Sequence, residues 1–135
     1  MANIKLSTWI VEDEPLALAM LKSYVDKTEM LELSMVFNSP SDLALALDNN
    51  RVADLVFMDL NIGNGKALDC IPVVQRHCRF LIITTAYFPA VVRRELDIDW
   101  RGIGFLHKPF SYRTFLSEVE RLVREGPAEP DIGHV

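Results

Sequence analysis

The chain has 135 residues, of which 50% are hydrophobic and 24% charged; these values are typical of one globular domain and leave no room for a second domain of ordinary size. Its 14 Lys and Arg residues are outnumbered by 19 Asp and Glu residues, and a formal net charge of -5 argues against a protein that binds nucleic acid directly. The sequence begins without the apolar core of a signal peptide and contains no apolar stretch long enough for a bilayer. We therefore expect no membrane insertion and a cytoplasmic location.

The first half of the chain alternates strand and helix patterns. Residues 6–11 form a short apolar, β-branched run that predicts a buried strand, and a proline then opens an amphipathic stretch over 15–27 that predicts a helix. Residues 31–37 alternate apolar and polar side chains, which predicts a less buried strand at an edge of the sheet. A serine cap followed by a proline begins a second predicted helix over 39–48.

The second half repeats this alternation three times. The expected strands and helices, in chain order, are 54–59, 67–77, 80–84, 89–96, 103–106 and 111–124. Five strands alternating with five helices predict an α/β fold, a doubly wound parallel sheet covered on both faces. The last residues carry two prolines and two glycines without an apolar period, so we expect one domain over 4–125 and a flexible tail over 126–135.

The two cysteines bear on the redox compartment. Cys70 and Cys78 lie eight residues apart in what the pattern predicts to be one helix, where two turns would separate them and prevent a disulfide. We expect both to be small core residues in a reducing compartment.

Polar residues end several of the predicted strands. Glu12 and Asp13 follow the first strand, Asp59 closes the third, a threonine pair ending in Thr85 closes the fourth, and Lys108 follows the fifth. The carboxyl ends of parallel strands meet at one edge, so these side chains should converge there. Three close carboxylates need a cation to stay ionised, and oxygen donors without His or Cys favour Mg²⁺. The ammonium and the hydroxyl then suit the remaining oxygens of a phosphoryl group.

Four short motifs, taken together, carry a resemblance to a known family. They are VEDEP at 11–15, DLVFMD at 54–59, TA at 85–86 and FLHKPF at 105–110. Each alone is weak, since an acid after a strand more often caps a helix. In this order, with 46 residues from Asp13 to Asp59, 26 to Thr85 and 23 to Lys108, the chain resembles the receiver domain of two-component response regulators, in the stand-alone form of the chemotaxis regulators.

The resemblance implies a fold, a reaction and a metal site. The fold would be flavodoxin-like, with five helices and strands in the order 2-1-3-4-5. Asp59 would be the phosphoacceptor, taking a phosphoryl group from a histidine kinase or a histidine phosphotransfer protein. Asp13 and Asp59 would bind Mg²⁺, with Glu12 helping directly or through water and the backbone carbonyl of Asn61 as a further ligand.

The resemblance also implies how the phosphoryl group is sensed. Thr85 would hydrogen-bond it, and Lys108 would pair with it from a peptide bond to the following proline that is usually cis in the family. Phe105 stands where the family has an aromatic switch residue, and Asn61 and Tyr87 occupy positions that tune the lifetime of the phosphoryl group. We expect a signalling phosphoacceptor that catalyses at most its own phosphorylation and dephosphorylation, not an enzyme.

The output would pass through the face of the fourth helix, fifth strand and fifth helix, where the Val-Val-Arg-Arg run at 91–94 is a candidate signalling surface. The target would be a separate protein, because the chain has no room for an effector domain; a homodimer is left open. Two other functions are also left open. One is a receiver-like interaction module that is not phosphorylated, which the intact site residues disfavour. The other is a Mg²⁺-dependent phosphohydrolase with an aspartyl nucleophile, which Asn61 disfavours because that class needs Asp there.

Overall fold

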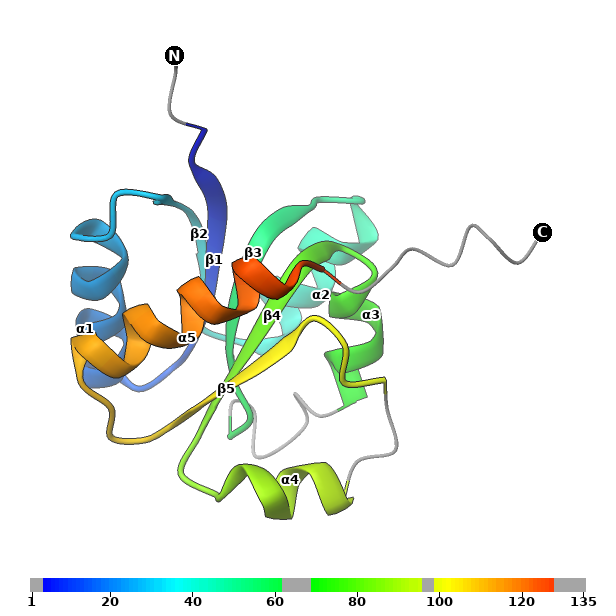
Figure 1. Cartoon of the computed structure of the whole chain (residues 1–135). Helices are drawn as coiled ribbons and strands as arrows, with labels where there is room; N and C mark the ends of the chain where they lie inside the picture. Colours follow the sequence, from blue (N-terminus) through cyan, green and yellow to red (C-terminus); the bar gives the residue numbers. More distant parts are fainter. Residues whose placement is uncertain (1–3, 62–68, 96–98, 128–135) are drawn as a thin grey trace.

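The computed structural model describes residues 4–61, 69–95 and 99–127. The strands and helices of these parts alternate along the chain as β1 Leu6–Val11, α1 Pro15–Asp26, β2 Leu31–Phe37, α2 Pro40–Asp48, β3 Ala53–Asp59, α3 Ile71–Gln75, β4 Cys78–Thr85, α4 Pro89–Glu95, β5 Ile103–His107 and α5 Tyr112–Glu125. The strands pair in parallel in the order β2-β1-β3-β4-β5 (Figure 1). The predicted doubly wound α/β fold, its strand order and the edge position of β2 are therefore confirmed.

Two apolar cores hold the helices against the two faces of the sheet. Figure 1 shows α1 and α5 on one side and α2 and α3 on the other. Along β3 the side chains alternate: Leu55 and Phe57 pack in the core under α1 and α5, whereas Val56 and Met58 pack in the core under α2, α3 and α4. Phe57 stacks on Phe115 of α5 with ring centroids 5.1 Å apart. We call these the α1/α5 core and the α2/α3 core.

Local capping signals fix where the long helices begin. The Glu14 carboxylate accepts hydrogen bonds from the Leu16 and Ala17 amides and so caps α1. Ser39 and Ser111 cap α2 and α5 through side-chain hydrogen bonds from backbone amides at 3.1 Å. The caps of α1 and α5 place the turns after β1 and β5, where the acidic pair and the lysine lie.

The prediction for the third helix was wrong in extent. The described helix is only Ile71–Gln75, and the predicted start at 67–68 lies outside the described residues. The cysteines do not share a helix: Cys70 precedes α3, whereas Cys78 pairs with Ala53 as the first residue of β4. The strand begins early because β3 extends back to Ala53 and offers a partner. Burial raises the pKa of the Cys78 thiol to about 12.

The strands at 6–11 and 31–37 have the predicted bounds, and the other predicted boundaries within the described residues differ by at most two residues. The predicted tail at 126–135 lies outside the described residues from 128 onward. None of the helices in the described ranges is both long enough and apolar enough to cross a membrane.

Candidate functional site

Three acidic side chains meet at the carboxyl end of the sheet. Glu12 follows β1 and Asp59 ends β3, the strand beside it, while Asp13 follows Glu12 into the loop before α1. One carboxylate oxygen from each lies within 4.8 Å of the others. Glu12 and Asp59 are 0% and 3% exposed, and Asp13 is on the surface. The convergence predicted from the strand ends is therefore found in the structure.

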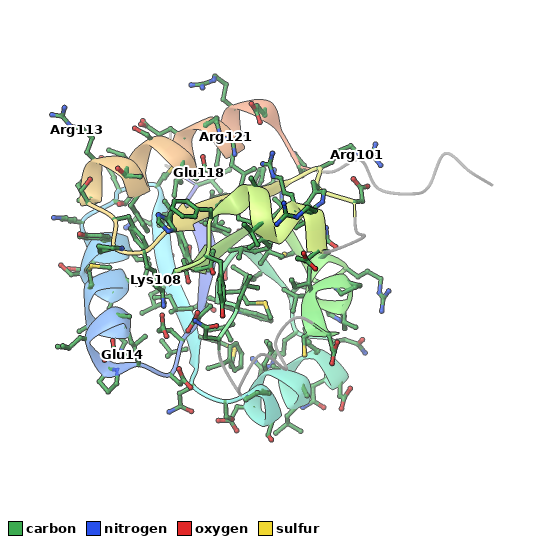
Figure 2. All side chains as sticks on the ribbon, turned by 90° about the horizontal axis from the view of Figure 1, so that it is seen from below. Glu14, Arg101, Lys108, Arg113, Glu118 and Arg121 are labelled. Atoms are coloured by element: carbon green, nitrogen blue, oxygen red, sulfur yellow. The ribbon has the colours of Figure 1, made fainter. Side chains whose placement is uncertain are left out.

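Lys108 brings one positive charge to these acids. It follows β5, and its Nζ lies 2.7 Å from Glu12 Oε1 and 3.5 Å from Asp59 Oδ1. Its backbone N–H donates to the Thr85 carbonyl at 2.7 Å, which ties the end of β5 to the end of β4. The bond from Lys108 to Pro109 is cis. Figure 2 looks onto the carboxyl edge of the sheet and labels Lys108 there.

The charges at this edge do not balance. Burial raises the pKa of the Glu12 carboxyl above its ordinary value; the Lys108 hydrogen bond opposes this shift and the neighbouring Asp59 adds to it. The Glu14 amide also donates to Glu12 Oε2 at 3.2 Å. One ammonium thus lies near two buried carboxylates, and a third, exposed carboxylate lies close to them. When ionised, the three acids carry more negative charge than Lys108 neutralises, and a divalent cation would neutralise the excess. The oxygen donors and their spacing fit Mg²⁺.

The remaining predicted residues lie around this cluster at different depths. The Asn61 amide donates to Asp59 Oδ1 at 3.0 Å, so the loop after β3 turns back onto the acid. Thr85 is fully buried, and its hydroxyl accepts from the Tyr87 amide at 3.0 Å. Tyr87 itself is 59% exposed. The hydroxyl of Thr85 is therefore held against its own loop.

Phe105 points into the molecule. Its side chain is 9% exposed and packs in the α2/α3 core, and its ring lies 5.3 Å from the ring of Trp100 and 5.1 Å below the Arg93 guanidinium. Its amide donates to Glu118 Oε2 of α5 at 2.7 Å. Of the candidate signalling run, Val92 is buried with this ring, whereas the arginines are exposed.

Two further residues with notable contacts or positions were given no role from the sequence. Glu118 reaches from α5 to the outer edge of β5, and Thr84 is a cross-strand neighbour of Asp59 with a buried side chain. Strand alternation could have placed Thr84 on the same face as Asp59. Nothing in the sequence pattern of α5 marks Glu118 among the exposed acids of that helix.

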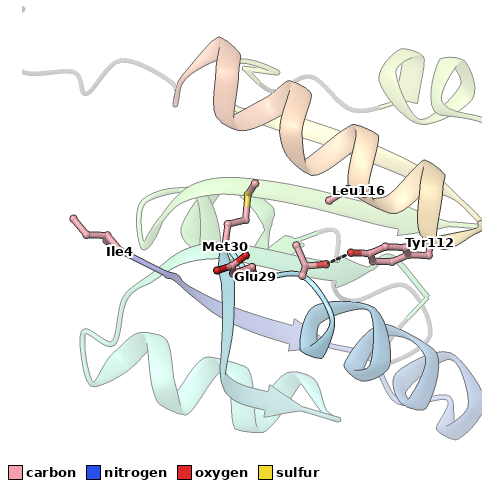
Figure 3. Close-up of a pocket in the computed structure, with 6 residues that line it drawn as sticks. Ile4, Glu29, Met30, Tyr112 and Leu116 are labelled. Carbon is pink, nitrogen blue, oxygen red and sulfur yellow. Dashed lines mark hydrogen bonds between the residues drawn. The ribbon is translucent and has the colours of Figure 1, made fainter. Parts of the chain in front are cut away.

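A separate groove of about 480 Å³ lies near the amino ends of β1 and β2, away from the acidic cluster (Figure 3). Across it, Tyr112 Oη and Thr28 Oγ1 lie 3.0 Å apart. Its lining residues are Ile4, Thr28, Glu29, Met30, Tyr112 and Leu116.

Comparisons with known proteins identify the fold. No family model and no curated protein matches the sequence. The REC domain of the PhyR response regulator from Erythrobacter litoralis is similar over 96% of this chain and 98% of its own, at 17% identity and a TM-score of 0.75. The isolated REC domain of RcsB from Salmonella enterica serovar Typhimurium, solved with the phosphomimetic BeF3-, is similar over 94% of each chain, at 19% identity and a TM-score of 0.71.

A response regulator receiver domain protein from Bacillus halodurans is also similar, over 92% of this chain and 99% of its own, at 15% identity and a TM-score of 0.67. The chain therefore has the receiver-domain fold.

Proposed function

We propose that this chain, over residues 4–125, is a response regulator receiver that accepts a phosphoryl group on Asp59 from a histidine kinase or a histidine phosphotransfer protein. One observation carries the proposal. In a receiver-domain fold, three carboxylates lie within 4.8 Å of one another at the carboxyl edge of the sheet, with the Lys108 ammonium 2.7 Å from the nearest of them. Ligands of open α/β sheets bind at this edge.

The acceptor carboxylate is held in one orientation. The Asn61 amide donates to Asp59 Oδ1, and Lys108 Nζ lies 3.5 Å from the same oxygen. In the transfer, a bond forms between an Asp59 oxygen and phosphorus, and the bond from phosphorus to the donor's imidazole nitrogen breaks. The electron pair of that bond stays on the nitrogen, and the ring leaves as neutral imidazole because its other nitrogen carries a proton. Orientation matters because this reaction depends on in-line positioning and on the neutralisation of charge.

A Mg²⁺ ion suits the donor set at this edge. Asp13, Asp59 and Glu12, together with the Asn61 backbone carbonyl, would hold it. When bound, it would supply the positive charge that lets an anionic carboxylate approach an anionic phosphoryl group. Burial raises the pKa of the Glu12 carboxyl and the neighbouring Asp59 adds to the shift, so a cation at this edge would favour the ionised form that binds metal.

The phosphoryl group would then change the contacts of Lys108 and Thr85. New negative charge on Asp59 would attract the Lys108 ammonium away from Glu12. It would also give the Thr85 hydroxyl, which accepts from the Tyr87 amide, a charged oxygen to which it can donate. Because Phe105 lies within β5, three residues before Lys108, this shift would bias its packing at the face of α4, β5 and α5. A typical coupling of this kind is about 1 to 3 kcal/mol.

The signal would pass from that face to a separate target protein in the cytoplasm, and the exposed Tyr87 would tune how long the phosphoryl group persists by shielding it from water. The protein would act as a phosphoacceptor and not as an enzyme on other substrates.

Intact mass after incubation with acetyl phosphate and Mg²⁺ tests the proposal. We expect one added phosphoryl group, which is lost in Asp59→Asn and prevented by a chelator added first. Asp54→Asn is the matched control, because Asp54 lies on the same strand but at its other end, where it accepts from the Ser7 amide; it should label as the parent does. No label on the parent chain would favour an interaction module, and a label that persists in Asp59→Asn would show a different acceptor.

A further inference from the structure

Thr84 has a buried hydroxyl without a hydrogen-bond partner. The residue is 0% exposed. Among the buried side-chain oxygen and nitrogen atoms in the described parts of the chain, its Oγ1 is the one without a hydrogen-bond partner. Thr8, another fully buried strand threonine, instead donates to the Leu6 carbonyl at 3.0 Å. A buried polar group without a partner lowers stability, so an unpaired hydroxyl in a folded protein calls for an explanation.

The register places this hydroxyl at the acidic cluster. Thr84 pairs with Asp59 on one side and with Leu106 on the other. Ile82, two residues earlier on the same strand, packs in the α1/α5 core together with Phe57 and Leu106. By strand alternation, Thr84 faces the same side of the sheet as Asp59, two residues after Phe57.

The Lys108 side chain crosses the strand that carries Thr84. Lys108 follows β5, yet its ammonium lies near Asp59 at the end of β3 and near Glu12 after β1. Because β4 lies between β5 and β3, the lysine must extend across the end of β4. It does so from the position two residues after Leu106, on the face that Thr84 shares. By register, the unpaired hydroxyl lies on the face of the sheet over which the lysine extends.

An ammonium has three N–H donors. In this structure one of those on Lys108 is used by Glu12 Oε1 at 2.7 Å, and the contact to Asp59 is longer, at 3.5 Å. The lysine therefore has donor capacity beyond its short bond to Glu12, and Thr84 has an acceptor that is not in use. The two complement each other in chemistry and lie on one face.

We propose that Thr84 is a positioning residue for Lys108, whose hydroxyl accepts a hydrogen bond from the ammonium when the lysine leaves Glu12 for a phosphoryl group on Asp59. This inference rests on the proposed function. It explains why the hydroxyl is retained: it is unpaired in the unmodified protein and paired in the reacting one. The unpaired hydroxyl raises the free energy of the unphosphorylated protein relative to that of the phosphorylated protein, and this difference favours the transfer.

Acetyl phosphate labelling with Mg²⁺ and thermal unfolding test the proposal on three variants. Thr84→Val keeps the shape and removes the hydroxyl; we expect the maximal labelling rate to fall about tenfold, the loss of one hydrogen bond to a charged group, with the half-saturating phosphodonor concentration unchanged. The same variant should melt about 3 °C higher without phosphodonor, because the unpaired group is gone. Thr84→Ser should label at the parent rate.

Thr8→Val is the matched control, because it removes a hydroxyl that is already paired. It should melt lower than the parent and label at the parent rate. The proposal is overturned if Thr84→Val labels as fast as the parent, whatever its melting temperature, or if Thr84→Ser is as slow as Thr84→Val. Failure of the parent chain itself to label would count against the proposed function and would be seen before any variant is compared.

Discussion

Two glutamates in different regions of the molecule, Glu12 and Glu118, show how the protein treats an acid with and without enough donors. The side chains of Glu12, at the strand-end site, and Glu118, between α5 and β5, are 0% and 17% exposed. Burial raises the pKa of Glu12, and the charge of Asp59 raises it further against the pull of Lys108. Burial also acts to raise the pKa of Glu118, but its hydrogen-bond partners and nearby arginines outweigh burial and hold the pKa below its ordinary value.

The difference lies in how many donors each carboxylate receives. Glu118 accepts from Arg121 Nε and Nη2 at 2.7 and 3.0 Å and from the Phe105 amide at 2.7 Å. Figure 2 shows Glu118 and Arg121 side by side on α5. Glycine at 104 leaves the space for this contact, since a Cβ there would lie 2.7 Å from Glu118 Oε2. The carboxylate closes the outer edge of β5, an edge strand whose amides would otherwise lack partners.

Glu12, in contrast, shares one ammonium with Asp59. Around Glu118 the protein itself balances the negative charge, so the carboxylate stabilises the fold. Around Glu12 the negative charge exceeds the positive charge, so a bound cation would be needed to balance it. Neutralising an acid should therefore have opposite effects in the two places.

The largest effect should come from Glu118→Ala. The change leaves the Phe105 amide without its acceptor and Arg121 without its bidentate partner, so the free energy of unfolding should fall by about 3 kcal/mol. Urea unfolding measures it. Glu120→Ala, an exposed acid on the same helix, is the control and should stay within about 0.5 kcal/mol of the parent. Equal losses in the two variants would show that Glu118 contributes no more to the free energy of unfolding than an exposed acid of the same helix.

Magnesium should stabilise the other region by a similar amount. At a free Mg²⁺ concentration 100 times its dissociation constant, the free energy of unfolding should rise by about 2.7 kcal/mol. Asp13→Asn should remove most of this gain. Because Asp13 is exposed, the same variant should unfold within about 0.5 kcal/mol of the parent when no metal is present. A gain that survives in Asp13→Asn would remove this residue from the metal site.

Asp59→Asn should stabilise the metal-free protein, the reverse of the effect at Glu118. Asparagine keeps the shape and can still accept from the Asn61 amide, while the repulsion with Glu12 is lost. We expect the free energy of unfolding to rise by about 1 kcal/mol in chelator-treated buffer, as when one of two like charges sharing a site is removed. A destabilised Asp59→Asn would mean that Lys108 already balances this cluster.

Much of the fold and the outline of the site could be predicted, because they depend on local patterns. Apolar runs predicted the strands, a capping serine predicted the start of α2, and the rule for parallel strands brought Glu12, Asp59 and Lys108 to one edge. The receiver resemblance added the strand order and the cis bond at Lys108, which local patterns do not encode.

What could not be predicted depends on how elements sit against each other. Cys78 joined β4 instead of α3 because β3 extends back to Ala53, a matter of register. Glu118 became a partner of Phe105 because α5 packs with that face toward β5, and other acids of the helix look the same in the sequence. The unpaired hydroxyl of Thr84 depends on which side chains reach the end of β4, and no local pattern in the sequence encodes that.

The smallest expected effect is a difference in pH dependence between Glu12→Gln and Glu118→Gln. Because the folded pKa of Glu118 lies below its ordinary value of 4.5, its stabilisation is complete above pH 4.5 and is lost as the pH falls through the lowered pKa. The loss in Glu118→Gln should therefore shrink toward low pH. Because the folded pKa of Glu12 lies above 4.5, ionisation weakens the fold as the pH rises from 4.5 through the raised pKa.

Glu12→Gln should accordingly gain on the parent as the pH rises over that window, with a slope no steeper than about 1.4 kcal/mol per pH unit, the limit for one proton. Urea unfolding in metal-free buffer between about pH 3.5 and 7.5 measures both variants against the parent, with Glu120→Gln as a control that should show no trend. The two differences must change in separate windows, one below and one above pH 4.5. If Glu12→Gln instead lost stability relative to the parent as the pH rose, the ionised Glu12 carboxylate would stabilise the fold. The excess negative charge on which the cation site is argued would then be absent.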